Sequence, residues 1–194
     1  MKEIISSISV ILFFVSLIPY IAGILKGKVK PRPLSWLGWS LLLGVGIFSQ
    51  VYENGFDISM SITIASSISC LIIFLLSLAK NNFKNKKIDY TCFFLGIVCM
   101  IVYVVTRNPL ITTIFSISAD FLVGIPTILN VYKLPRSENM LSWGIGTFAI
   151  FLSFLVALTE SDSLLKIYPT YLFFFNALIF ILCIRRFNFV SKNK

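Results

Sequence analysis

A segment that occurs twice constrains the fold of this chain more than any other feature. Ile18-Pro19 is followed sixteen residues on by Leu34-Ser35-Trp36, and Ile125-Pro126 is followed at the same spacing by Leu141-Ser142-Trp143. The offset of 107 residues, from Ile18 to Ile125, needs no gap. Apolar matches between hydrophobic stretches are common by chance, but shared Pro and Leu-Ser-Trp positions are not. An internal repeat in a membrane chain is typical of transporters, whose substrate site lies where the repeats meet.

The chain is hydrophobic enough to cross a membrane several times. Hydrophobic residues make up 57% of it and charged residues 13%, which is outside the range of soluble domains. A spanning helix needs about 17–25 mostly apolar residues. Seven stretches meet or approach this length: 4–25, 35–52, 58–79, 90–106, 109–132, 141–159 and 167–184. We therefore predict an all-α membrane protein with seven transmembrane helices, in which Ser35 and Ser142 act as N-caps.

The basic residues between these stretches predict the orientation of the chain. Fourteen Lys and Arg residues fall at the ends and loops of one side, and three (Lys2, Arg107 and Lys166) fall on the other. Loops rich in Lys and Arg stay in the cytoplasm, so we expect the N-terminus outside and the C-terminus inside. Seven spans satisfy this, and the localisation is then a multi-pass protein of the plasma (inner) membrane.

The repeat also predicts the organisation of the helices. Residues 1–79 form a first triple-helix repeat, 80–107 a linker loop and fourth helix, 108–186 a second triple-helix repeat, and 187–194 a basic cytoplasmic tail. Three spans reverse the direction of the chain, so a directly fused second copy would enter the membrane inverted. One linker helix restores the direction. This 3+1+3 order predicts two parallel repeats.

Several classes of function are disfavoured by what the sequence lacks. It has no His, and its four Cys form no CxxC pair. We therefore expect no enzyme, no catalytic residues, no metal and no cofactor. The net charge of +9 is concentrated between the apolar runs, so it is explained by membrane orientation better than by nucleic-acid binding. The expected partners are the lipid bilayer and a small polar solute, with or without protons. An oligomer is allowed but not required.

Two segments resemble the motif of the SWEET and PQ-loop transporters (the MtN3-saliva superfamily). That motif has a Pro-Gln pair near the end of the first helix of each bundle, a short basic loop, and Leu-Ser at the start of the next helix. Pro19 with Leu34-Ser35 and Pro126 with Leu141-Ser142 match it. The chain departs from the motif where Tyr20 and Thr127 replace the Gln. It also has glycines where SWEETs have prolines in the second helix of each bundle: Gly38, Gly44, Gly46, Gly144 and Gly146.

The resemblance implies site residues as well as a fold. SWEETs contact substrate through an Asn on the third helix of each bundle. Asn176 fits that pattern, and Ser69, its partner at the same offset, departs from it. Pro19 and Pro126 lie near the cytoplasmic ends of their helices, where a proline bends a helix. They are expected as the hinge or gate, although static kinks are the alternative.

Asp120 is the only formally charged residue deep inside a predicted span. A carboxyl group there is costly and normally faces a partner or a wet cavity. Three roles are open: contact with a polar or cationic substrate, a protonatable site, and one structural hydrogen bond between helices. Gln50, near the outer end of the second span, is a further candidate for the pocket lining.

These observations predict a membrane transporter that moves a small polar solute, such as a sugar, an amino acid or a vitamin-like compound. The two bundles would alternate in opening a central pocket to either side. A sugar uniporter follows from the SWEET resemblance, and proton coupling follows from Asp120. The alternative is a PQ-loop-type membrane receptor or assembly protein that does not transport.

Overall fold

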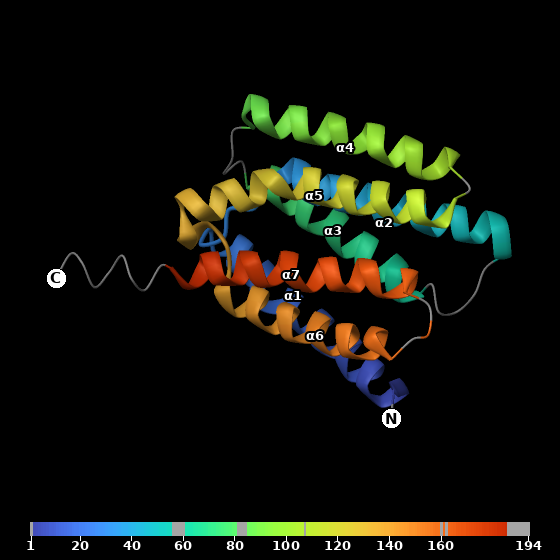
Figure 1. The fold of residues 1–194 in the computed structure, drawn as a ribbon. Coiled ribbons are helices and arrows are strands. Elements are labelled where there is room, and N and C mark those ends of the chain that lie inside the picture. Colours follow the sequence, from blue (N-terminus) through green and yellow to red (C-terminus); the bar gives the residue numbers. More distant parts are fainter. Residues whose placement is uncertain are drawn as a thin grey trace. The chain divides into compact units, whose positions relative to one another are not determined.

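The chain is all-helical in the computed structural model, which describes residues 2–55, 61–80, 85–106, 108–159, 161 and 163–185. Seven α-helices follow one another over these residues (Figure 1). They are α1 (Lys2–Leu25), α2 (Pro33–Asn54), α3 (Ser61–Ala79), α4 (Lys87–Val105), α5 (Pro109–Lys133), α6 (Met140–Leu158) and α7 (Leu164–Ile184). A 3-10 turn, η2 (Pro135–Ser137), lies between α5 and α6.

Local sequence signals explain where several helices begin and end. Proline is the first residue of α2 and of α5, where its missing N–H costs nothing and its φ suits a helix. Asn108 Oδ1 accepts from the backbone N–H of Leu110 at the start of α5. Gly55, with φ of 77°, ends α2 and donates to the carbonyl of Val51. A residue without a Cβ adopts this left-handed conformation most easily.

The N-cap prediction for the two serines is wrong. Asn139 caps α6, and its Oδ1 accepts from the backbone N–H of Ser142 at 3.1 Å. Ser142 therefore lies in the first turn of the helix and is not its cap. Ser35 likewise lies within the first turn of α2, after Pro33 and with Arg32 at the N-cap position. In both copies the proline or asparagine signal outweighs the serine.

One compact unit consists of residues 1–30 and 128–194, so far as these are described. It holds α1, the last turns of α5, η2, α6 and α7. Helix α6 packs against α1 and against α7 (Figure 1). Ser9 on α1 fixes the first of these contacts, since its Oγ donates to the carbonyl of Ala149 at 2.7 Å and lies 2.6 Å from Ser153 Oγ. Hydroxyl groups that bond across helices satisfy themselves without water.

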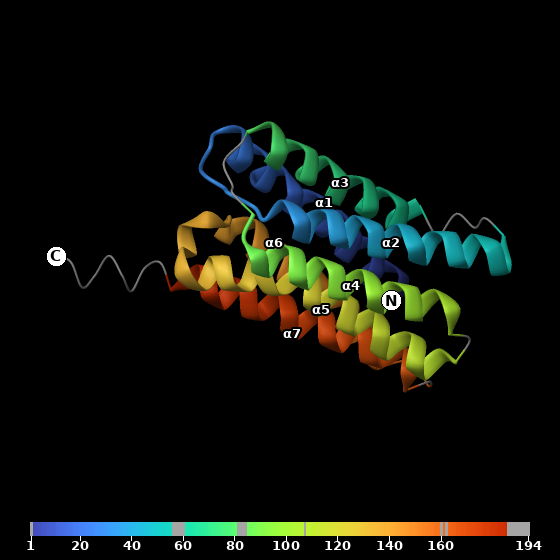
Figure 2. The ribbon, with the colours of Figure 1, turned by 90° about the horizontal axis from the view of Figure 1, so that it is seen from above.

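The second compact unit is residues 31–127 and holds α2, α3, α4 and most of α5. Helix α2 packs against α3 and α4 (Figure 2). Ser40 on α2 and Ser67 on α3 are joined by reciprocal bonds, each Oγ donating to the other residue's carbonyl at 2.9 Å. The first helix of each predicted repeat, α1 and α5, therefore belongs largely to the unit that holds the second and third helices of the other repeat.

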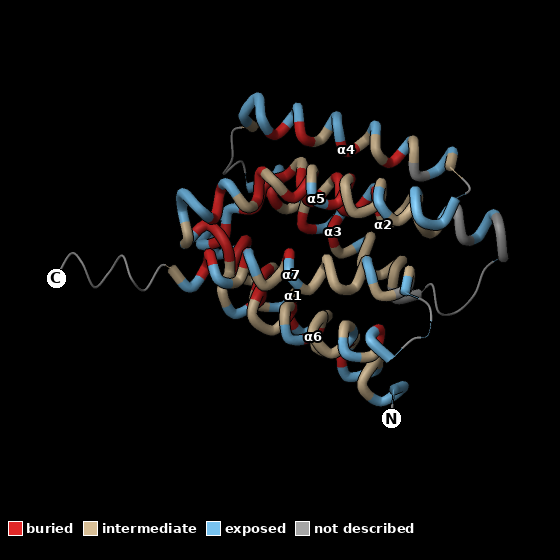
Figure 3. Tube along the Cα trace, viewed as in Figure 1, coloured by how far each residue is buried: buried red, intermediate tan, exposed pale blue. Residues whose placement is uncertain are grey.

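Many large apolar side chains on the helices are exposed. Figure 3 marks the exposed residues along the chain in pale blue. Examples on four different helices are Ile18 at 67%, Phe94 at 67%, Phe148 at 54% and Phe174 at 62%. Apolar surface of this extent is unusual on a water-soluble protein. Over the described residues, four helices have the length and hydropathy of membrane spans, namely α1, α5, α6 and the Lys166–Ile184 part of α7. Shorter apolar helical stretches are Pro33–Phe48 and Thr63–Ala79. These features indicate a multi-pass membrane protein.

Candidate functional site

Asp120, the central residue of the predicted site, is buried within α5. Asp120 is 6% exposed, and its neighbour Ala119 is fully buried. The carboxyl group interacts electrostatically with the thiol of Cys70 on α3, which is also buried. Asp120 therefore faces the interior of its unit rather than the lipid. That placement is what a costly polar group in an apolar helix requires.

The packing one turn after Asp120 is unusually close. Val123 on α5 is 1% exposed and approaches both α2 and α4. A Cβ added at Gly38 on α2 or at Gly96 on α4 would lie 2.6 Å from Val123 Cγ1. Because real Cβ atoms do not approach so closely, glycine at these two positions lets three helix backbones come together. Small residues thus fix the helix that carries Asp120.

Ser69 and Asn176 each donate a side-chain hydrogen bond to a backbone carbonyl of their own helix. Ser69 Oγ donates to the carbonyl of Ala65 at 2.7 Å, and Asn176 Nδ2 donates to the carbonyl of Leu172 at 2.9 Å. Both residues are half-buried. The amide oxygen of Asn176 has no hydrogen-bond partner among the described residues. That oxygen is the group of Asn176 left to accept a bond from a solute.

The predicted site residues are divided between the two units. Asp120 and Ser69 belong to residues 31–127, and Asn176 belongs to the other unit. Gln50 lies in α2, but its side chain is outside the described part of the structure. A pocket shared by all four residues stays a prediction.

Both predicted hinge prolines lie inside continuous helices. Pro19 is within α1 and Pro126 within α5. The carbonyl of Pro19 accepts a hydrogen bond of 2.8 Å from Asn139 Nδ2. Pro126 is fully buried, and the boundary between the two compact units falls between residues 127 and 128, directly after it.

A buried acid lies in the loop between α5 and α6. Glu138 is 2% exposed, and its Oε2 accepts two hydrogen bonds, from Tyr20 Oη at 2.6 Å and from Trp143 Nε1 at 3.0 Å. Burial raises the pKa of Glu138 to about 7, although the two hydrogen bonds act in the opposite direction. Glu138 thus joins α1 to the first turns of α6.

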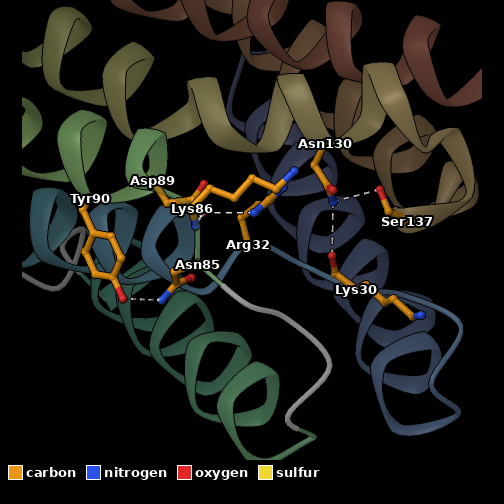
Figure 4. Close-up of polar contacts among 8 residues, drawn as sticks. All are labelled: Lys30, Arg32, Asn85, Lys86, Asp89, Tyr90, Asn130 and Ser137. Carbon is orange, nitrogen blue, oxygen red and sulfur yellow. Dashed lines mark hydrogen bonds and ion pairs between the residues drawn. The ribbon is translucent and has the colours of Figure 1, made fainter.

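A neighbouring set of bonds holds the loop after α1 to the same region. Asn130 Nδ2 donates to Ser137 Oγ at 2.9 Å and to the carbonyl of Lys30 at 3.3 Å (Figure 4). The backbone N–H of Lys30 in turn donates to the carbonyl of Ser137 at 2.7 Å. Two loops far apart in the sequence are therefore fastened side by side within one unit.

The other unit has a buried ion pair at the start of its helices. Arg32 Nη1 lies 2.9 Å from Asp89 Oδ2, which also accepts from the backbone N–H of Lys86 at 2.5 Å (Figure 4). The side chains are 6% and 1% exposed. Burial lowers the pKa of Arg32, and the charge and hydrogen bond of Asp89 partly offset this. The pair connects the residue before α2 with the first turn of α4.

Sequence reasoning missed Glu138 and Asp89 as interior residues. Each is a single acid in a segment that otherwise carries Lys and Arg, such as Lys133 and Arg136 before Glu138. An isolated acid among basic residues is a usable signal, because a solvated face would show no such contrast. The partners, Tyr20 and Arg32, are 118 and 57 residues away in sequence. No local pattern connects them.

Within the residues described, no group of three or more His, Cys, Asp or Glu side chains is placed to hold a metal ion. Comparison with protein families, with characterised proteins and with solved structures gives no match to this chain.

Proposed function

We propose that this protein is a membrane transporter that moves a small polar solute by alternating access between two helix bundles. The observation that carries the proposal is Asp120, buried at 6% exposure in a helix long and apolar enough to span the membrane. A carboxyl group in such a position is costly and marks a solute or proton pathway more often than a purely structural contact. The solute classes it suits are amino acids, sugars and vitamin-like compounds.

The repeat supports the same conclusion from the sequence. Seven spans in 3+1+3 order, with parallel repeats of the SWEET and PQ-loop type, would place equivalent helices on either side of a central solute site. Positive loops on one side then put the N-terminus outside and the C-terminus in the cytoplasm of an inner-membrane protein.

The position of Pro126 supports a hinge in α5. The boundary between the two compact units falls inside α5, directly after Pro126 and Thr127. A proline inside a helix lacks the N–H that would bond to the carbonyl four residues earlier, which weakens the helix at that point. Helix α5 passes from one unit to the other close to this missing hydrogen bond. It is therefore suited to act as a hinge when each unit moves as a rigid body.

The test is uptake by proteoliposomes of a panel of sugars, amino acids and nicotinamide riboside, with and without a pH gradient. We compare the wild-type protein with Asp120→Asn and with the control Ser118→Ala. Ser118 lies two residues away on α5 and donates its Oγ hydrogen bond to the carbonyl of Ile114 on its own helix. Uptake driven by the gradient, lost in Asp120→Asn and kept in Ser118→Ala, is the expected result.

Two other outcomes have defined meanings. If the rate of uptake changes neither with the pH gradient nor in Asp120→Asn, the transport proposal holds. Asp120 is then a structural residue in a uniporter. Absence of uptake of every solute by protein shown to be folded overturns the proposal. A membrane receptor or assembly protein would then be the better description.

A further inference from the structure

The buried acid Glu138 is bonded unevenly through its two oxygens. Oε2 accepts from both Tyr20 Oη and Trp143 Nε1, whereas Oε1 is buried and has no hydrogen-bond partner among the described residues. An ionised carboxylate is stabilised by the first two bonds and destabilised by the bare second oxygen. Burial outweighs the two bonds, so this environment favours the protonated carboxyl more than water does.

No nearby positive charge fixes Glu138 in its ionised form. Within the described residues, no basic side chain forms an ion pair with it. The titratable or charged groups at the nearby ends of the surrounding elements include Tyr20 on α1, the exposed Lys26, Lys28 and Lys30 after α1, Tyr132 and Lys133 at the end of α5, Arg136 in its own loop, and Cys183 and Arg185 at the end of α7. Helix α6 contributes the Trp143 indole, which does not titrate. Arg185 is engaged elsewhere, with its guanidinium 4.6 Å from the centre of the Tyr132 ring.

We propose that the Glu138 carboxyl is a proton-binding site that keeps α1 fastened to α6 when it is protonated and loosens this attachment when it is ionised. The ligand is the proton itself, and the site lies outside the spans, in the loop between α5 and α6. It is distinct from Asp120 and does not depend on transport being the function of the protein.

The change in attachment follows from the cost of burying the ionised carboxylate. The bonds from Tyr20 and Trp143 favour the ionised form, but burial outweighs them and raises the pKa of Glu138. Separation of α1 from α6 would hydrate the carboxylate and bring its pKa back toward the ordinary value, so loss of the proton favours separation. The bond from Asn139 to the Pro19 carbonyl is a second attachment at this point.

The location of the site connects protonation with a weak point of α1. Tyr20 directly follows Pro19, whose ring interrupts the helix hydrogen bonds. Loss of the proton from Glu138 would thus loosen the contact of the residue next to the proline. The second copy of the repeat has no counterpart, because the residues equivalent to Glu138 and Tyr20 at the offset of 107 are Pro31 and Thr127. The pair of Tyr20 and Glu138 is therefore not duplicated by the repeat.

The experiment is a direct titration of the Glu138 carboxyl by NMR of the full-length protein in detergent, labelled with ¹³C at the glutamate side-chain carboxyl. The chain has four glutamates, Glu3, Glu53, Glu138 and Glu160, and Glu138→Gln identifies the signal of interest. We expect a midpoint near 7, well above the value of about 4.3 of an ordinary Glu.

Two variants test whether the bonds to Glu138 act as described. Tyr20→Phe and Trp143→Phe each remove a bond that favours the ionised form, so the midpoint should rise in both. Tyr132→Phe is the matched control, since Tyr132 contacts Arg185 instead, and it should leave the midpoint unchanged. If Glu138→Gln does not fold, the one signal that moves in Tyr20→Phe and not in Tyr132→Phe makes the assignment.

The mechanical part is tested by amide hydrogen exchange over residues 19–25, corrected for the intrinsic effect of pH. Exchange there should quicken as the pH rises through the midpoint, and Glu138→Gln, which is always neutral, should show the slow rate throughout. A midpoint in the ordinary acidic range, or one indifferent to Tyr20→Phe, overturns the proton site. A midpoint near 7 together with an exchange rate that does not change with pH overturns the loosening of α1.

Discussion

Arg32 and Asp89 are paired at 2.9 Å in a part of the chain that is rich in Lys and Arg. Both side chains are buried, and Asp89 also receives the backbone N–H of Lys86. Arg32 immediately precedes α2, and Asp89 lies in the first turn of α4. The pair thus sets the relative position of two helix starts in one unit.

Breaking this pair from one side should be costly. We expect Arg32→Gln or Asp89→Asn to lower the free energy of unfolding by roughly 3–5 kcal/mol, because each leaves a buried charge without its partner. The measurement is thermal unfolding in detergent, followed by tryptophan fluorescence. Lys30→Gln is the control, since Lys30 is exposed and only its backbone is bonded.

The double change Arg32→Met with Asp89→Leu separates specific pairing from general disruption. Removing both charges leaves none unpaired, so this variant should be more stable than either single variant. A double variant that loses as much as the two single variants combined would contradict the assignment of an ion pair.

Glycine at two positions sets the spacing of helices around Val123. Gly38→Ala or Gly96→Ala would bring a Cβ to 2.6 Å from Val123 Cγ1, and overpacking of this kind costs about 1–3 kcal/mol. Gly44→Ala is the control on the same helix, because its nearest neighbour is Ser67 Oγ at 3.8 Å. There alanine should be neutral or stabilising, since it favours a helix over glycine by about 1 kcal/mol.

A compensating change checks the cause. Val123→Ala removes Cγ1, the one atom that a Cβ at position 96 would meet closer than 3.5 Å, so it should recover stability lost by Gly96→Ala. Recovery on the Gly96→Ala background, against the loss that a cavity causes on the Gly44→Ala background, would confirm the contact. Equal losses at Gly38, Gly96 and Gly44 would show that helix packing at Val123 is not the reason.

The positions of the helices along the chain were predictable from sequence, but which helices pack against each other was not. The predicted stretch 109–132 agrees with α5 (Pro109–Lys133), and 141–159 agrees with α6 (Met140–Leu158). Each boundary is set locally, by a proline, a cap or the first charged residue after an apolar run. The contact of α1 with α6 depends instead on side chains such as Ser9 and Ala149, which are 140 residues apart.

The site was predictable to the same limited extent. Asp120 stands out because one acid in an apolar run is a strong contrast, and it is buried as expected. Glu138 differs from the basic residues around it in the sequence, but that contrast does not show that Tyr20 and Trp143 enclose it. Burial of a loop residue is a property of the tertiary fold, which the repeat pattern does not encode.

Asn139 makes two bonds that can be tested separately. Its Oδ1 caps α6 at Ser142, and its Nδ2 donates to the Pro19 carbonyl at 2.8 Å. Asn139→Ala loses both and should cost about 1–2 kcal/mol. Asn139→Asp keeps the cap but turns a carboxylate oxygen toward the Pro19 carbonyl, so it should also be destabilising.

The matched comparison for Asn139 is Asn108, whose Oδ1 caps the start of α5 and which is exposed. Asn108→Asp should be nearly neutral in thermal unfolding, because aspartate is as good a cap as asparagine. A neutral Asn139→Asp would mean that the bond to Pro19 contributes nothing and that capping alone explains Asn139.

The titration of Glu138 predicts how stability depends on pH. Its pKa is raised to about 7 in the folded protein from an ordinary value of 4.5, so between these values the folded state holds a proton that the unfolded state has released. The folded state is then favoured at the acidic end of this window and loses stability as the pH rises toward 7. The difference is on the order of 3 kcal/mol, and above pH 7 Glu138 adds no further dependence.

This dependence should disappear in Glu138→Gln, whose amide does not titrate. Measured by tryptophan fluorescence, the wild-type melting temperature should fall between pH 5 and pH 8 by roughly 5–10 °C beyond any fall in the variant. Glu3→Gln is the control, because Glu3 is exposed on the first turn of α1, and its curve should follow the wild type. A Glu138→Gln curve that keeps the full pH dependence would place the responsible group elsewhere and contradict the raised pKa of Glu138.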